Sequence, residues 1–153
     1  ELESDLIDVL NTAMTTEENE ASKVELALFY KDKDPQKAYA YFKEALNNKP
    51  NDFKLLKEVI SLGLQLGHFK AALKYTDVAL SVFPTQPVFY YAKAVAHVEQ
   101  QQFDTALSQL DLGFSLLIGS SQLKANYHQL YAQIYNQLDQ PEKAKFHESQ
   151  LNQ

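Results

Sequence analysis

The chain has 153 residues and a formal net charge of −6 without any basic run, which disfavours a surface that follows nucleic-acid phosphates or anionic membranes. Hydrophobic residues make up 45% of the sequence, which is too many for a disordered chain, and the absence of cysteine excludes disulfides and thiolate chemistry. No apolar run is long enough to span a bilayer, so we expect no membrane insertion.

The first element is expected over residues 4–14, whose apolar side chains fall on one helical face. We interpret the segment 1–18 as a capping helix or as the tail of an earlier structural unit. The chain begins at Glu1 rather than at Met, as we expect of an excised or mature form, and the sequence leaves its compartment open. Thr15 and Glu18 have the spacing of a capping box, so we interpret the acidic stretch 15–20 as a helix start rather than a catalytic cluster.

Two helices are expected in each of the segments 19–52 and 53–86. In the first segment, Asp34 can cap a helix that starts at Pro35, where the missing backbone N–H of proline costs nothing. In the second segment, Gly67 is expected to end the first helix in a left-handed conformation. Gly63 lies inside that helix, where glycine costs about 1 kcal/mol relative to alanine, so we expect a bulky side chain to approach it closely.

The segments 87–120 and 121–153 continue the helical pattern. The helix expected from Val88 to Val98 is apolar on almost every side, so it is either covered all round or carries an apolar strip that something else covers. In the last segment, tyrosines recur at helical spacing before a second helix that is expected to start at Pro141. We interpret them as core side chains with hydroxyls at the rim, rather than as a stacking platform for bases: Tyr127, Tyr131 and Tyr135.

These four segments are shifted copies of one another. A step of 34 residues superposes Ala38 on Ala72 and Pro50 on Pro84, and the next step of 34 superposes Ala72 on Ala106. The aromatic residues Tyr41 and Tyr75, and Phe69 and Phe103, follow the same step. The last step, from Ala106 to Ala144, is 38 residues, and we expect the loop 119–121 and a longer following helix to absorb the difference.

This period, with a glycine and an aromatic residue opening a helix and a proline closing it, resembles the tetratricopeptide repeat (TPR). The resemblance implies an all-α fold, a right-handed superhelix of antiparallel helix pairs with about nine helices in one domain, 1–153. Its repeats would be 19–52, 53–86, 87–120 and 121–153, after the segment 1–18. The small residues at equivalent positions would let the two helices of each repeat approach to about 8–10 Å: Ala38, Ala72, Ala106 and Ala144.

The resemblance also implies a function. In TPR proteins the first helices of successive repeats line a concave groove that binds peptides or protein segments, so we expect a non-enzymatic interaction module with a protein or peptide partner. Two positions that need asparagine in members that clamp C-terminal carboxylates hold Ala27 and Glu58 here, which argues against a chaperone-tail clamp. The groove positions carried over to this chain are Lys23, Ala27, Tyr30, Lys57, Ser61, Leu64, Tyr91, Val95, Val98, Gln129, Gln133 and Asn136.

An alternative function is a structural spacer or self-assembling segment of a longer repeat array, which would contact other copies through the apolar groove or the C-terminal face. An enzyme ranks third, because glycine-rich phosphate loops and His-Glu-x-x-His are missing from the sequence. We expect no cofactor, no metal and no nucleic-acid partner, since no candidate reading helix carries the basic residues that DNA recognition needs. The histidines lie far apart in sequence, and we interpret them as partly buried, hydrogen-bonded side chains: His68, His97, His128 and His147.

Overall fold

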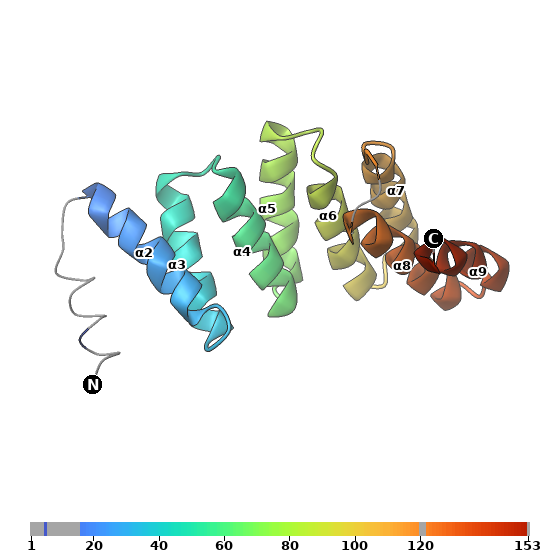
Figure 1. Ribbon diagram of the computed structural model, residues 1–153, viewed down its shortest axis with the longest axis horizontal. Helices are drawn as coiled ribbons and strands as arrows, with labels where there is room; N and C mark the ends of the chain where they lie inside the picture. The colour runs from blue at the N-terminus through green and yellow to red at the C-terminus, as the bar shows by residue number, and fades with distance from the viewer. Residues whose placement is uncertain (1–4, 6–15, 120–121, 153) are drawn as a thin grey trace. The chain divides into compact units, whose positions relative to one another are not determined.

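The computed structural model describes residues 5, 16–119 and 122–152, and its regular structure over those residues is helical (Figure 1). The helix expected over residues 4–14 falls largely outside the described residues, so the expected total of about nine helices is not tested. Thr15 of the proposed capping box also lies outside them. The described helices form two compact units that divide between Gly67 and His68. The assignment of the whole chain to one domain and the four repeat limits stay predictions.

The described residues of the first unit form the helices α2 (Thr16–Tyr30), α3 (Pro35–Asn48) and α4 (Phe53–Gln65). Asp34 caps α3 as expected, because its carboxylate accepts the backbone N–H of Lys37 at 3.1 Å and Pro35 opens the helix. Asp52 caps α4 in the same way through the N–H of Leu55 at 3.0 Å. Gly67, which follows α4, has a φ of 77°, so the predicted left-handed residue is confirmed.

The core of the first unit lies between these helices, because α3 packs against both α2 and α4. Small residues make the close approach possible: Ala27 on α2 and Ala38 on α3 are fully buried. Large side chains fill the remaining space, among them Phe42 and Leu56. Two ion pairs link these elements at the surface: Lys23 of α2 lies 3.1 Å from Glu44 of α3, and Lys31, which follows α2, lies 2.7 Å from Glu58 of α4.

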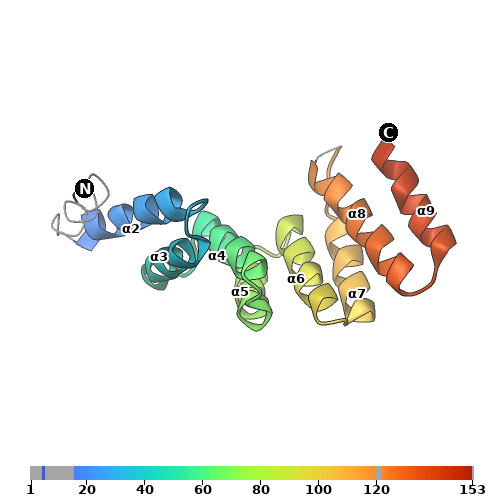
Figure 2. The ribbon, with the colours of Figure 1, turned by 90° about the horizontal axis from the view of Figure 1, so that it is seen from below.

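The second unit contains α5 (Phe69–Val82), α6 (Pro87–Glu99), α7 (Phe103–Phe114), α8 (Gln122–Gln137) and α9 (Pro141–Ser149), followed by the short 3-10 helix η1 (Gln150–Asn152). Each helix packs against the next along the chain, and α6 also contacts α8. Helices α8 and α9 lie side by side in both views (Figure 2). Helix α9 starts at the predicted residue, Pro141, and α6 starts at Pro87, one residue before the expected Val88.

Helix α6 is covered on two sides, which explains its apolar sequence. It packs against α5 and α7, and Phe89, Ala94 and Val98 are all buried. Its first residue accepts a hydrogen bond at 2.6 Å from the hydroxyl of Tyr127, which fixes α8 against the start of α6. Tyr127 is itself fully buried beside Gly113 of α7, where a larger residue would collide with its hydroxyl.

Candidate functional site

The predicted groove residues of the first unit differ in accessibility. Lys57 and Ser61 are exposed on one face of α4 and Leu64 is half-buried, whereas Lys23 is occupied by its ion pair with Glu44. Tyr30 is only 3% exposed, because its ring packs 6.1 Å from that of Tyr41 and lies under the ammonium of Lys37. The expectation that Tyr30 is open to a ligand is therefore corrected.

The predicted groove residues of the second unit lie on two helices that contact each other. On α6, Tyr91 and Val95 are half-buried against the core, and the Tyr91 ring lies 5.4 Å from that of Tyr127. Val98, one turn further on, is 7% exposed and belongs to that core, so it too is not open to a ligand. On α8 the three amide side chains are exposed: Gln129, Gln133 and Asn136. That the predicted groove residues of all four repeats line one continuous groove stays a prediction.

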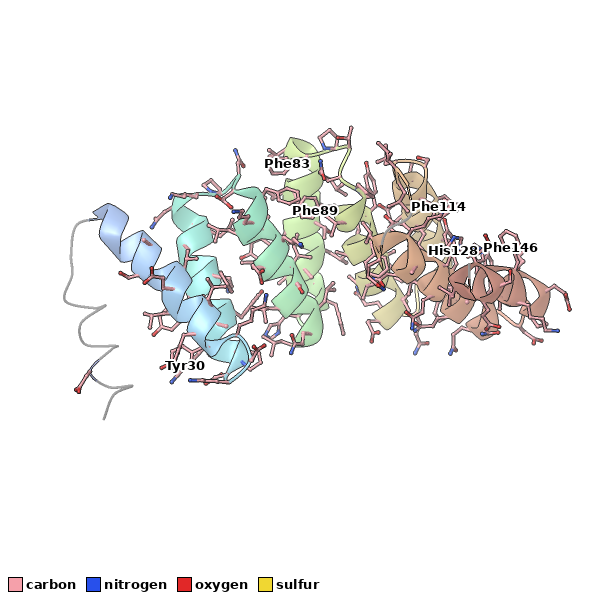
Figure 3. All side chains as sticks on the ribbon, in the orientation of Figure 1. Tyr30, Phe83, Phe89, Phe114, His128 and Phe146 are labelled. Atoms are coloured by element: carbon pink, nitrogen blue, oxygen red, sulfur yellow. The ribbon has the colours of Figure 1, made fainter. Side chains whose placement is uncertain are left out.

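A pocket of about 320 Å³ opens on a different face of α8. Successive turns of α8 supply its floor, while α7 contributes one wall and α9 with η1 the other. At about 100° per residue, this face is turned by roughly 140° from the face that carries Gln129 and Gln133. The lining residues are Asp111, Phe114, Lys124, His128, Tyr131, Tyr135, Phe146, His147 and Gln150; Figure 3 shows Phe114, His128 and Phe146 gathered in this part of the unit.

Two histidines join α8 to α9 in this pocket. The Nδ1 atoms of His128 and His147 are 2.9 Å apart, so one ring donates a hydrogen bond and the other accepts it. Burial lowers the pKa of His128, and the positive charge of Lys124 lowers it further. Burial also lowers the pKa of His147, and the neighbouring His128 adds to that effect. Both rings are therefore neutral at pH 7 and share one hydrogen-bonding proton.

Aromatic rings and a carboxylate complete the pocket. The ring of His147 stacks 4.5 Å from that of Tyr131 and 5.7 Å from that of Tyr135, and the planes are within 20° of parallel. The hydroxyl of Tyr131 donates a hydrogen bond of 2.6 Å to Oδ1 of Asp111 on α7. Burial, followed by the hydrogen bond to Asp111, raises the pKa of Tyr131, so its hydroxyl stays a donor. Phe146 is 59% exposed at the margin.

The sequence does not indicate this pocket, because its two histidines lie 19 residues apart along the chain. The interpretation of His128 as a buried, hydrogen-bonded side chain agrees with its 6% exposure and its contact with His147. Two helices joined by one short turn pack in antiparallel fashion, and this packing could have predicted that His128 on α8 and His147 on α9 lie close together. Tyr127 and Tyr131 are core residues as interpreted, and Tyr135 is partly buried. The Tyr127 hydroxyl is not at the rim, because it lies inside against the carbonyl of Pro87.

The described residues contain no group of three or more His, Cys, Asp or Glu side chains that could hold a metal ion. Within the same part of the chain, no helix combines the length and apolar character needed to cross a bilayer.

Paired antiparallel helices with small residues at their crossings define this chain as a TPR-like helical repeat protein, of the α-solenoid type. A family model confirms the class: the one described as the TT21 fifth ARM repeats domain matches residues 19–113. The chain therefore belongs to this family of helical repeats. Families of this type are protein-binding scaffolds and are typically non-enzymatic.

Solved structures of MamA share the fold. MamA from Desulfovibrio magneticus RS-1 (residue 41 to the end) has a TM-score of 0.74 at 18% identity, covering 86% of this chain and 73% of that one. A structure of MamA MSR-1 has a TM-score of 0.72 at 16% identity, with coverages of 94% and 81%. A further crystal structure of MamA has a TM-score of 0.73 at 14% identity, with coverages of 93% and 80%. No curated protein matches the sequence.

Proposed function

We propose that this chain is a protein-interaction module that holds an extended segment of a partner on the α6–α8 surface of the second unit, defined by Tyr91, Val95, Gln129 and Gln133. The observation that carries the proposal is the partial exposure of two apolar side chains, Tyr91 and Val95, on a helix whose residues Phe89, Ala92, Ala94, Ala96 and Val98 are buried. A half-exposed tyrosine is the type of side chain that anchors protein interfaces, and the neighbouring valine extends its apolar surface.

The neighbouring amide side chains supply hydrogen-bonding groups for the backbone of a bound segment. Gln129 and Gln133 are one turn apart on α8, exposed, and on a helix that contacts α6. A glutamine side chain both donates and accepts hydrogen bonds, so it can pair with an extended peptide backbone without selecting a charge. Apolar anchor positions on α6 and backbone-binding amides on the contacting helix α8 favour an uncharged segment of the partner.

The experiment selects peptides from a random display library on the intact chain and measures their affinities for variants. We expect the double variant Gln129→Ala/Gln133→Ala, at exposed sites that leave the fold unchanged, to weaken the selected peptides about tenfold, the effect of one lost hydrogen-bonding group of about 1.4 kcal/mol. Tyr91→Ala should weaken them further. Lys74→Ala on α5, also exposed, is the control. Affinities that stay equal in all variants would overturn the proposal.

A second candidate function is self-assembly through the C-terminal helix. It is favoured by the exposure of Phe146 (59%) on α9 and Leu151 (42%) on η1, which are large apolar side chains on neighbouring elements. Light scattering over a range of concentrations tests it. A stable dimer that Phe146→Ser converts to a monomer would support self-assembly, whereas a monomer at every concentration would exclude it.

A further inference from the structure

We propose that the pocket formed by α7, α8 and α9 binds the guanidinium group of an arginine side chain in a partner segment. This site lies on a different face of α8 from the surface of the proposed function and goes beyond it. The observation is a carboxylate, Asp111, in the wall of a pocket whose other lining includes Tyr131, Tyr135 and His147 with nearly parallel rings.

The aromatic planes favour a flat cation. Tyr131 and Tyr135 are inclined by 11° to each other, and His147 by 14° and 20° to them. Tyr131 is buried under His147, so a guanidinium plane would lie parallel to the two partly exposed rings, Tyr135 and His147. Arginine stacks on aromatic rings and is more weakly hydrated than lysine, so it loses less hydration in such a pocket. In the chain itself, Nζ of Lys143 lies 5.1 Å from the centroid of the Tyr135 ring, so one face of this ring already carries a cation.

The carboxylate of Asp111 supplies the charge. Its Oδ1 accepts the hydroxyl of Tyr131 at 2.6 Å, which holds the group in position. A carboxylate has about four acceptor sites, so further hydrogen bonds from a guanidinium fork can be added. Asp111 is exposed, so its charge is solvated before the ligand arrives and no buried charge needs to be created.

The remaining polar groups of the pocket set the selectivity. The neutral histidines His128 and His147 share one proton and present no cationic pair to an anionic side chain. Lys124 also lines the pocket and opposes any cation, which limits the affinity. Removing its charge should therefore strengthen arginine binding more than removing the charge of Lys74, which is exposed on α5 outside the pocket.

The test uses acetyl-Gly-Arg-Gly-amide as the probe, titrated into the full chain and followed by the side-chain NMR signals of His147 and Tyr131. The matched neutral probe contains citrulline, which has nearly the same shape as arginine without its charge, and a third probe contains lysine. We expect saturable binding of the arginine peptide and affinities about tenfold weaker for the other two, as the loss of a charge-assisted hydrogen bond implies.

Variants distinguish binding of arginine in the pocket from general electrostatic attraction to the acidic chain. Asp111→Asn should weaken the arginine peptide about tenfold, and Lys124→Gln should strengthen it. Asp104→Asn, also exposed on α7, removes the same charge outside the pocket and should have little effect. Equal binding of the arginine and citrulline peptides, or equal effects of Asp104→Asn and Asp111→Asn, would overturn the proposal. Gln129→Ala/Gln133→Ala should leave this binding unchanged, so a failure here is distinct from a failure of the proposed function.

Discussion

The Nδ1 atoms of His128 and His147 lie 2.9 Å apart, and this contact joins α8 to α9. Ala144 is the one buried residue of α9, so the histidine pair and the stacking of His147 on Tyr131 are a large part of what holds this helix in place. Protonation of both rings would place two positive charges at hydrogen-bonding distance and leave no acceptor nitrogen between them. The attachment of α9 therefore depends on the protonation of the pair.

Acid should consequently weaken the second unit. The pKa of both histidines is lowered in the folded chain, mainly by burial, from an ordinary value of about 6.5. The unfolded chain thus binds protons more readily, so the stability that the pair contributes is present above about pH 6.5 and is lost as the pH falls below it. Melting temperatures between pH 5 and pH 8 should show this loss in the wild-type chain, and His128→Gln and His147→Gln should both reduce it. A pH profile that is unchanged in both variants would contradict the prediction.

Gly113 should tolerate no larger residue. A Cβ atom there would collide with the hydroxyl of Tyr127 and would lie 2.6 Å from Cβ of Tyr90. To make room, Tyr127 would have to give up its hydrogen bond to the carbonyl of Pro87. We expect Gly113→Ala to destabilise the chain by about 1–3 kcal/mol despite the better helix propensity of alanine. Thermal melts against Ser108→Ala, an exposed site on the same helix, check this; equal melting temperatures would show that α7 and α8 are not in close contact.

Ala106 should be similarly intolerant, because it is fully buried within the cluster that includes Leu110, Tyr127 and Ile134. Ala106→Leu adds three carbon atoms to a packed core, which typically costs about 1–3 kcal/mol. Thr105→Leu introduces the same side chain at the exposed neighbouring position and is the matched control. The melting temperature should fall for Ala106→Leu alone, and a similar fall in both variants would put the repeat register in doubt.

The cap of α3 gives a prediction for the first unit. Asp34→Ala removes the acceptor of the Lys37 N–H and should cost about 0.5–2 kcal/mol. Asp32→Ala removes an acidic side chain from the same turn without removing the cap. Chemical unfolding followed by circular dichroism should therefore distinguish the two variants, and equal effects would mean that charge rather than capping matters at this turn.

The helix boundaries could be predicted because local chemistry determines them. Pro35, Pro87 and Pro141 each open a helix, and Gly67 adopts the left-handed conformation that its position required. The buried alanines were also predictable, since a constant period marks the positions where helices cross.

Side-chain contacts between helices were harder to predict. The family pattern placed Tyr30 and Val98 in a groove, but their burial depends on neighbours such as Tyr41 and on the core around α7 and α8. The contact between His128 and His147 likewise depends on how two helices pack, which spacing along one helix does not reveal.

Binding of a partner segment to the α6–α8 surface is tested most directly by mapping where a selected peptide binds. Backbone amide chemical shifts of the isotopically labelled chain, recorded with and without the peptide, report this residue by residue. The account predicts the largest changes around Tyr91 to Val95 on α6 and Gln129 to Gln133 on α8, with little change around Lys74 on α5. Changes confined to α5, or to α9 around Phe146, would contradict it.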